Sequence, residues 1–455
     1  MKHDVMRQKF HQFFLLVAFV LVWLWTINIQ VVQDHWSSPN WAAPHETINA
    51  DDFEFHYVFS TGCNAFQDWQ SWTFFYHAHQ LGIQHVTRVA SGCSKEQQAS
   101  IRASHQTQVQ ALAPTYQLHL TPDFTRVIPG KTYKFFNKPY GLRHWMENRL
   151  GFPHRSKEYD NTIFVLMDPD QMLLRPFQQD MTAYASSMKW VKNPAKPIQI
   201  RTGQPFAQLY GLGSKWVPSI NGNLTDILSY LPPEEAKTSQ LHQWTEQDVK
   251  DYYVAGPPYL ATGPDLYRIV NTWATIVIPV YRATDDFLSE MYAYATAAAH
   301  WGLKHHLTHS FMVSNPTVLQ EGWHWMDHSP ATAVCASASQ YEADSSKYYL
   351  PNVLHYCQRY FLGPYFFSKY ILPKNFLSCE HPLLVEPELD IASQYETSVT
   401  PNGELNEIPK KQRNRHAFML CHMIHGLNEA ASYWKEHHCR DGNTAKTFLF
   451  KKHKS

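Results

Sequence analysis

One short segment constrains the fold of this chain more than any other. Residues 163–167 (IFVLM) are all apolar, and Asp168, Pro169 and Asp170 follow directly. An apolar run without polar alternation is typical of a strand that is buried on both faces of an α/β sheet. Ligands of open α/β sheets bind beyond the carboxyl ends of such strands. The sequence therefore predicts two carboxylates at a position where a sheet of this kind binds its ligand.

Short apolar strands and helical patterns alternate around this segment. Over residues 55–180 this alternation predicts an α/β fold with a doubly wound mixed sheet flanked by helices. The expected strands are 56–60, 85–90 and 116–120, and the expected helices are 69–79, with Gly82 as its C-cap, and 142–150. Further on, we expect a fully buried helix at 290–300, loops or an inserted subdomain at 190–260, and a peripheral helix at 416–439.

An apolar stretch near the N-terminus, residues 13–32, matches the ~30 Å hydrocarbon core of a bilayer at 1.5 Å per residue. Lys2, Arg7 and Lys9 precede it against one acid, Asp4, which favours a cytoplasmic N-terminus. A cleaved signal peptide is the alternative, but residues 26–33 offer no small-x-small cleavage site.

We therefore expect a single-pass type II membrane protein. The predicted organisation is a cytoplasmic tail (1–12), a transmembrane signal-anchor (13–32), a stem (33–52), a luminal domain (53–390) and a C-terminal extension (391–455).

Composition narrows the class of protein. Basic and acidic residues number 39 each, and a formal net charge of zero argues against a nucleic-acid binder. Seven cysteines fit an oxidising compartment with up to three disulfides and one thiol left over. Asn223 begins a sequon that is usable in such a compartment.

Asp168 and Asp170 suit a divalent cation that is shared with phosphate oxygens. A surface turn or a helix cap is the alternative, but two bare charges after a buried strand need a partner. His355 ends another apolar stretch and is a candidate third ligand, although most of the 27 histidines must be ordinary surface or core residues.

Basic side chains are the third requirement of such a site, because a departing nucleoside diphosphate develops negative charge. Lys131, Lys134, Lys138 and Arg143 lie among aromatic residues, where they can hold phosphates or form a solvated basic face. Arg88 lies within an expected strand, so its charge must be paired if it points inward. The sequence has no Walker loop, GxGxxG, HExxH or GxSxG motif.

Several segments together resemble a known family, in order, across residues 55–390. The chain is similar to the plant and algal peptidyl serine α-galactosyltransferases and to their sister family, the hydroxyproline O-arabinosyltransferases. The segments that carry this resemblance are 59–70, 86–93, 137–145, 168–170, 290–294, 355–356 and 365–369.

The resemblance implies a Golgi or ER glycosyltransferase with a GT-A-like fold. Its donor would be a UDP-sugar, its cofactor Mn²⁺, and its acceptor Ser or hydroxyproline in hydroxyproline-rich proteins, with the anomeric configuration retained. The transferred sugar would be galactose or arabinofuranose. A catalytically silent lectin or scaffold of the same fold, or a transferase that acts on a glycan or lipid, are the alternatives.

Matched residue by residue, Asp168 and Asp170 correspond to the family's Asp-x-Asp, and His355 corresponds to its His-Tyr element. Lys138 lies in the Asn-Lys-Pro element and is assigned to the diphosphate. The chain departs from the family pattern at Pro169, which replaces a small residue, and at residues 261–265, which are only loosely similar.

The remaining candidate roles are hypotheses. Arg143, Lys134 and Arg88 are candidates for donor binding beside Lys138. Asp265, Glu290 and Glu321 are acids that would orient the acceptor or stabilise an oxocarbenium-like state, and the sequence does not rank them. A buried structural role is the alternative for Glu290.

Overall fold

The computed structural model describes residues 53–189, 198–318, 321–327, 330–335, 350–399 and 405–449. The predicted cytoplasmic tail, signal-anchor and stem lie outside these residues. Within the described ranges, no helix is both long and apolar enough to cross a membrane.

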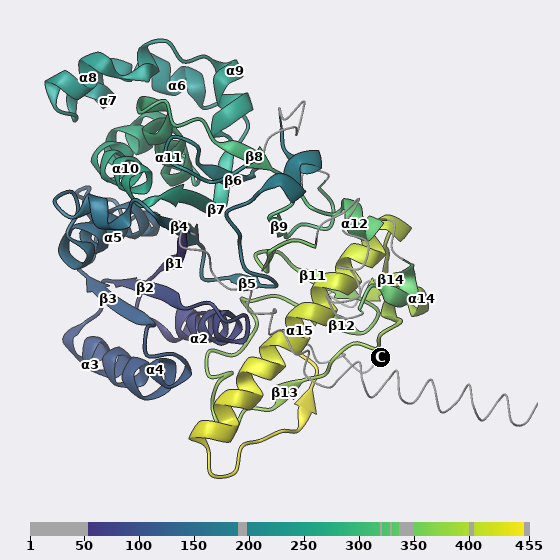
Figure 1. Cartoon of the computed structure of the whole chain (residues 1–455). Coiled ribbons are helices and arrows are strands. Elements are labelled where there is room, and N and C mark those ends of the chain that lie inside the picture. Colours follow the sequence, from purple (N-terminus) through teal and green to yellow (C-terminus); the bar gives the residue numbers. More distant parts are fainter. Residues whose placement is uncertain are drawn as a thin grey trace, which may run out of the picture.

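A seven-stranded sheet forms the centre of the molecule, in the order β3-β2-β1-β4-β7-β6-β8 (Figure 1). The strands β1, β2, β3 and β4 are parallel to one another. β7 runs antiparallel to both β4 and β6, and β8 is parallel to β6. This is the mixed α/β architecture expected for a GT-A-like fold. The strands are β1 (Glu54–Thr61), β2 (His85–Ser91), β3 (Gln117–Thr121), β4 (Thr162–Met167), β6 (Phe206–Leu209), β7 (Ala255–Thr262) and β8 (His306–Thr308).

β4 is buried along its whole length, as its sequence predicts. Ile163, Val165 and Met167 pack in the core on the side of α2 (Ala65–Gln80). Phe164 and Leu166 pack in the opposite core. That second core includes α5 (Asn137–Trp145), α10 (Gly263–Thr284) and α11 (Ser289–His300) (Figure 1). Because helices cover both faces, a strand without alternation is stable at the centre.

Most of the expected elements in the first half of the chain are confirmed. The strands at 56–60, 85–90 and 116–120 correspond to β1, β2 and β3. Every residue of α11 is buried, as expected for a helix that is apolar around its circumference.

The prediction of loops or an inserted subdomain at 190–260 is wrong in part, because β6 and β7 belong to the central sheet. β7 contains Gly256, Pro257 and Pro258, which have low strand propensity and conceal the strand in the sequence. Between the two strands lie four short α-helices, α6 (Val217–Gly222), α7 (Leu224–Ser229), α8 (Pro233–Thr238) and α9 (Glu246–Asp248), together with a 3₁₀ turn and a π-helical turn.

A second, three-stranded sheet lies beside the first, in the order β5-β10-β9. It contains β5 (Gln171–Leu173), β9 (Met312–Val313) and β10 (Val353–His355). The remaining elements are α3 (Lys95–Ser104), α4 (Gln110–Leu112), α12 (His324–Asp327), α14 (Ile391–Gln394), β11 (Tyr360–Leu362), β12 (Tyr365–Phe367), β13 (Leu383–Leu384), β14 (Thr397–Val399), β15 (Leu405–Glu407) and β16 (Lys446–Thr447).

The long C-terminal helix α15 (Lys410–His438) crosses this part of the molecule (Figure 1). A helix was expected at 416–439, but it is not peripheral, because residues of its central turns are buried in a core that it shares with β10, β11 and β12. Arg415 makes a bidentate ion pair with Asp327 at 2.8 Å and further anchors the helix.

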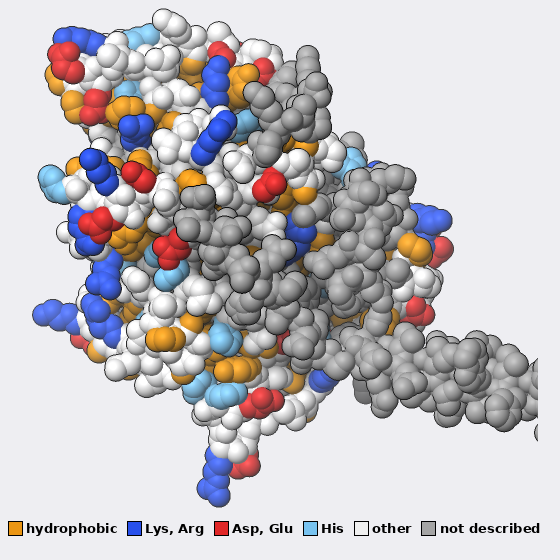
Figure 2. Space-filling model, viewed as in Figure 1, with side chains coloured by type: hydrophobic (Ala, Val, Ile, Leu, Met, Phe, Trp, Pro, Cys, Tyr) orange, Lys and Arg blue, Asp and Glu red, His pale blue; other side chains and the backbone are white. Residues whose placement is uncertain are grey.

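Three disulfides join Cys63–Cys93, Cys335–Cys421 and Cys379–Cys439, and Cys357 remains a free thiol. This is the number of bridges that the cysteine count allows. Cys335–Cys421 attaches α15 to a distant loop, and Cys379–Cys439 does the same for the residue after α15. Cys63–Cys93 joins the loops after β1 and β2. On the face drawn in Figure 2, basic and acidic side chains are interspersed, as a net charge of zero would suggest.

Candidate active site

A tight turn at the end of β4 places the two predicted carboxylates. The amide of Gln171 donates to the carbonyl of Asp168 at 3.2 Å, and the amide of Asp168 donates to Oε1 of Gln171 at 2.9 Å. Gln171 is fully buried, and its Nε2 donates to the carbonyl of Pro257 in β7. The turn that carries Asp168 and Asp170 is therefore fixed to the central sheet and leads directly into β5.

His355 reaches the same turn through the second sheet. β10 pairs antiparallel with β5, and His355 lies opposite Gln171. The amide of Tyr356 donates to the carbonyl of Asp170 at 3.1 Å. As a result, ligand atoms of Asp168, Asp170 and His355 all lie within 4.8 Å of one another.

Two lysines complete the cluster. Lys138, near the start of α5, donates to Oδ1 of Asp168 at 2.7 Å, and its Nζ lies 3.8 Å from Oε1 of Glu290. Lys369, just after β12, donates to Oδ2 of Asp170, the oxygen that lies 3.3 Å from Nε2 of His355. We call these six residues the carboxylate cluster: Lys138, Asp168, Asp170, Glu290, His355 and Lys369.

Burial and charge shift the pKa values within this cluster. Burial alone would raise the pKa of Asp170, but His355 and Lys369 hold it well below its usual range. Burial would lower the pKa of His355, yet Cys357 and Asp170 raise it well above its usual value. Burial raises the pKa of Glu290 to about 7, although Lys138 opposes the shift. Strongly perturbed groups that share one location are typical of a functional site.

The donor atoms suit a divalent cation. Two carboxylates and an imidazole are ligands that Mn²⁺ and similar ions accept. In addition, Nδ1 of His355 and Oε1 of Glu290 are buried without a hydrogen-bond partner. Buried polar atoms without a partner are rare in folded proteins, so their presence here is consistent with a ligand that completes the site.

Asp265, a predicted catalytic residue, does not join this cluster. β7 pairs antiparallel with β4, and Thr262 lies opposite Ile163, at the amino end of β4. Asp265 follows in the first turn of α10. At ~3.3 Å per residue, the stretch of chain from Ile163 to Asp168 spans about 15 Å or more, so Asp265 and Asp168 lie at opposite ends of β4. The carboxylate of Asp265 accepts from the amide of Gly203 at 2.6 Å and from Oγ1 of Thr262 at 3.2 Å, so it joins the start of α10 to the loop before β6.

Two other predicted residues make their contacts away from the carboxylates. Arg143 contacts Thr275 of α10 at 3.4 Å, and the exposed Lys134 lies over the ring of Phe135. Glu321 is buried and accepts hydrogen bonds from the backbone of Ser314 and Asn315, so it orders a loop. It lies close enough to His355 for the imidazole to oppose the rise in the pKa of Glu321 that burial causes.

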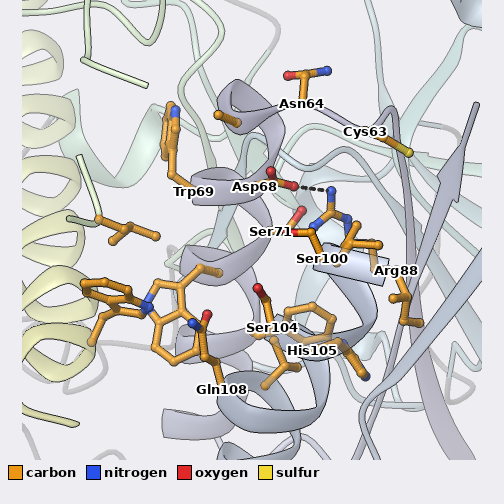
Figure 3. Close-up of a pocket in the computed structure, with 18 of the residues that line it drawn as sticks. Cys63, Asn64, Asp68, Trp69, Ser71, Arg88, Ser100, Ser104, His105 and Gln108 are labelled. Carbon is orange, nitrogen blue, oxygen red and sulfur yellow. Dashed lines mark hydrogen bonds and ion pairs between the residues drawn. The ribbon is translucent and has the colours of Figure 1, made fainter. Parts of the chain in front are cut away.

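Arg88 lies at a separate cavity of about 560 Å³, which is lined largely by α2 and α3 (Figure 3). We call it the Arg88 cavity. The guanidinium donates to Asp68 at 2.7 Å, to Oγ1 of Thr61 at 2.9 Å and to the carbonyl of Gly62 at 3.3 Å. The expectation that a charge at this strand position must be paired is therefore confirmed. Trp69 also lines the cavity, and its ring stacks on Tyr356, the neighbour of His355.

Lys369 is the residue of the cluster that sequence reasoning did not single out. It lies at the end of the segment 365–369 that carries the family resemblance, and this was the available indication. A lone lysine after an aromatic strand has no pattern that identifies its partner, so only the fold reveals Asp170 beside it.

Carboxylates, an imidazole and lysines at the carboxyl edge of an α/β sheet are typical of an enzyme that binds a metal–phosphate ligand. The chain is similar to the peptidyl serine alpha-galactosyltransferase of Arabidopsis thaliana, with 24% identity over 282 residues. The match covers 59% of this chain and 29% of the relative, so the chain spans less than a third of that protein. This match confirms the relationship to a glycosyltransferase that was inferred from the sequence motifs.

No protein-family model matches the chain. Among solved structures, it has weak similarity to the apo WbbM bifunctional glycosyltransferase, with 10% identity and a TM-score of 0.31, over 68% of this chain and 47% of that one. It has similar weak similarity to an active-site mutant of LgtC, with 10% identity and a TM-score of 0.33, over 67% of this chain and 87% of that one.

Proposed function

We propose that the chain is a metal-dependent glycosyltransferase that transfers a sugar from a UDP-sugar to Ser or hydroxyproline in a protein acceptor. The observation that carries this proposal is the convergence of Asp168, Asp170 and His355 within 4.8 Å at the end of a central strand. The curated relative is named as a peptidyl serine galactosyltransferase, which supports the choice of acceptor class.

In this proposal Asp168, Asp170 and His355 hold a divalent cation, Mn²⁺ in the first instance. When bound, the cation would neutralise charge on the departing nucleoside diphosphate. Lys138 and Lys369 provide positive charge in a buried setting, where electrostatic stabilisation is stronger than in water.

The transfer itself breaks the bond between the sugar C1 and the phosphate oxygen and forms a bond from C1 to the acceptor hydroxyl oxygen. The hydroxyl proton passes to an oxygen of the departing diphosphate. With retention of configuration, the acceptor approaches from the face that the nucleotide leaves. Glu290, which is buried beside Lys138, is the acid in the cluster that is placed to stabilise positive charge on the sugar.

Galactose and arabinofuranose are the proposed sugars, and hydroxyproline-rich proteins are the proposed acceptors. The proposal also places the catalytic domain in the lumen of the Golgi or ER, held by the apolar stretch at 13–32 in a type II orientation.

The test is nucleotide release by the purified full-length chain with Mn²⁺ and a panel of UDP-sugars, with and without a Ser/hydroxyproline-rich peptide. We expect release that requires peptide, metal and Asp170, with Asp170→Asn as the matched variant. Tight Mn²⁺–UDP binding without release from any donor would favour a silent lectin or scaffold. Release to a glycan or lipid but not to the peptide would replace the acceptor class.

A further inference from the structure

Each carboxylate of the proposed metal site is paired with an ammonium group from a distant part of the chain. Lys138 comes from α5 and contacts Asp168 at 2.7 Å, while Lys369 follows β12 and contacts Asp170. Both lysine side chains are largely buried, with 13% and 12% exposed, so water screens these pairs poorly.

The lysines contact the same oxygens that a cation would use. Oδ2 of Asp170 faces both Lys369 and His355, and Oδ1 of Asp168 accepts from Lys138. Buried ammonium and metal charges at these oxygens repel each other, because Coulomb interactions are strong where the dielectric is low. A cation and the two ammonium groups therefore compete for Asp168 and Asp170.

Charge balance indicates when this competition ends. The two lysines offset the charge of the two aspartates, and a divalent cation alone adds two positive charges beside two buried ammonium groups. The diphosphate of a UDP-sugar carries two negative charges, which offset those of the cation. Metal and diphosphate together therefore add no net charge to the cluster, whereas metal alone adds two positive charges.

We propose that Lys138 and Lys369 exchange partners when the donor binds, moving from the aspartates to the oxygens of the diphosphate. This inference rests on the proposed function. Glu290 lies 3.8 Å from Lys138 and gives its ammonium a second anionic neighbour during the exchange. The flexible lysine stems allow the movement without a change in the backbone. The exchange couples metal and donor binding, so that each strengthens the other.

The exchange predicts opposite effects of one substitution on two affinities. Lys369→Met removes the competitor of the cation, so it strengthens the binding of Mn²⁺ alone. The same change removes a phosphate contact, so it weakens the binding of UDP in the presence of Mn²⁺. Each effect corresponds to one charge-assisted contact, and we therefore expect about a tenfold change in each direction.

The test is titration of the full-length chain with Mn²⁺ alone and with UDP at saturating Mn²⁺, by calorimetry. It compares wild type, Lys138→Met, Lys369→Met and Lys369→Arg with Lys215→Met, a control at an exposed lysine outside the cluster. Lys369→Arg keeps the positive charge, so we expect Mn²⁺ alone to bind this variant as weakly as it binds the wild type. Thermal melting of each variant identifies those that fail to fold, and Lys138→Met provides the second substitution in that event.

If Mn²⁺ binding depends on Asp170 but is no stronger in either Lys→Met variant than in the wild type, the exchange is wrong and the proposed function is left intact. If the wild type shows no Mn²⁺ binding that depends on Asp170, both the exchange and the proposed function are wrong.

Discussion

The carboxylate cluster and the Arg88 cavity balance buried charge in different ways. In the cavity, Nε and Nη2 of Arg88 donate to one carboxylate and two neutral oxygens, so the guanidinium has a single counter-charge. In the cluster, several ionisable groups share a few oxygens, and atoms of His355 and Glu290 have no hydrogen-bond partner.

We expect this difference to distinguish a structural charge from a functional one. A buried charge with a complete set of partners holds its neighbours in place, whereas an incomplete set of partners is stable only when a ligand or the surrounding fold compensates. We therefore expect the Asp68–Arg88 pair to stabilise the fold and the carboxylate cluster to bind a ligand. The predictions below test that division.

The largest expected effect is the loss of transfer in Asp170→Asn and Asp168→Asn. Each change removes a charged ligand of the proposed cation, so we expect Mn²⁺-dependent transfer to fall by about 100-fold or more, since even changes beyond the direct ligands cost 10–100-fold. Initial rates at saturating Mn²⁺ measure the effect. Asp226→Asn, at an exposed aspartate, is the matched control. Full activity in Asp170→Asn would mean that the cluster is not the catalytic metal site.

The second prediction concerns the pH dependence of stability. Because burial raises the pKa of Glu290 from 4.5 to about 7, the folded state binds this proton more tightly than the unfolded state. The stabilising contribution is complete below about pH 4.5 and is lost as the pH rises towards 7. Over this window the free energy of unfolding should fall by roughly 3 kcal/mol because of this group.

Glu290→Gln should lack that slope, whereas the exposed control Glu234→Gln should keep it. Urea denaturation of both variants and wild type at pH 5 and pH 7.5 measures the difference. Equal slopes in wild type and Glu290→Gln would show that Glu290 titrates as an ordinary carboxyl group.

In the Arg88 cavity, Asp68→Ala should destabilise the fold and leave the affinity for Mn²⁺ unchanged. The change leaves Arg88 buried without its counter-charge, which costs about 3–5 kcal/mol in a fully buried pair. Since 51% of the Asp68 side chain is exposed, we expect a smaller cost, about 1–3 kcal/mol. Thermal melting and Mn²⁺ titration measure the two quantities, and a weaker Mn²⁺ affinity would contradict the separation of the two regions.

The smallest expected effect is that of Arg88→Met, about 1 kcal/mol of stability, because Asp68 is left in contact with water. UDP affinity at saturating Mn²⁺ is the informative second measurement. A large loss of UDP affinity with little change in melting temperature would assign Arg88 to the donor, as the sequence hypothesis has it, and would reverse the division drawn above.

Local patterns account for much of what was predicted. The apolar run before Asp168 identified a central strand, because only burial on both faces makes such a run stable. The helix at 290–300 was identified for the same reason. β7 was missed because glycine and two prolines conceal it, and its antiparallel pairing with β4 and β6 compensates for their low propensity.

The sequence by itself determined the central strand, the two carboxylates at its end and a cysteine count that allows three disulfides. Only the tertiary structure decided which charges meet. Pairing of β10 with β5 brings His355 to Asp170, and packing of α5 and of the segment after β12 brings Lys138 and Lys369 to the aspartates. Neighbours in sequence fix the conformation of a strand, but the partner of a buried charge lies in a distant segment, and strand register and helix packing decide which segment that is.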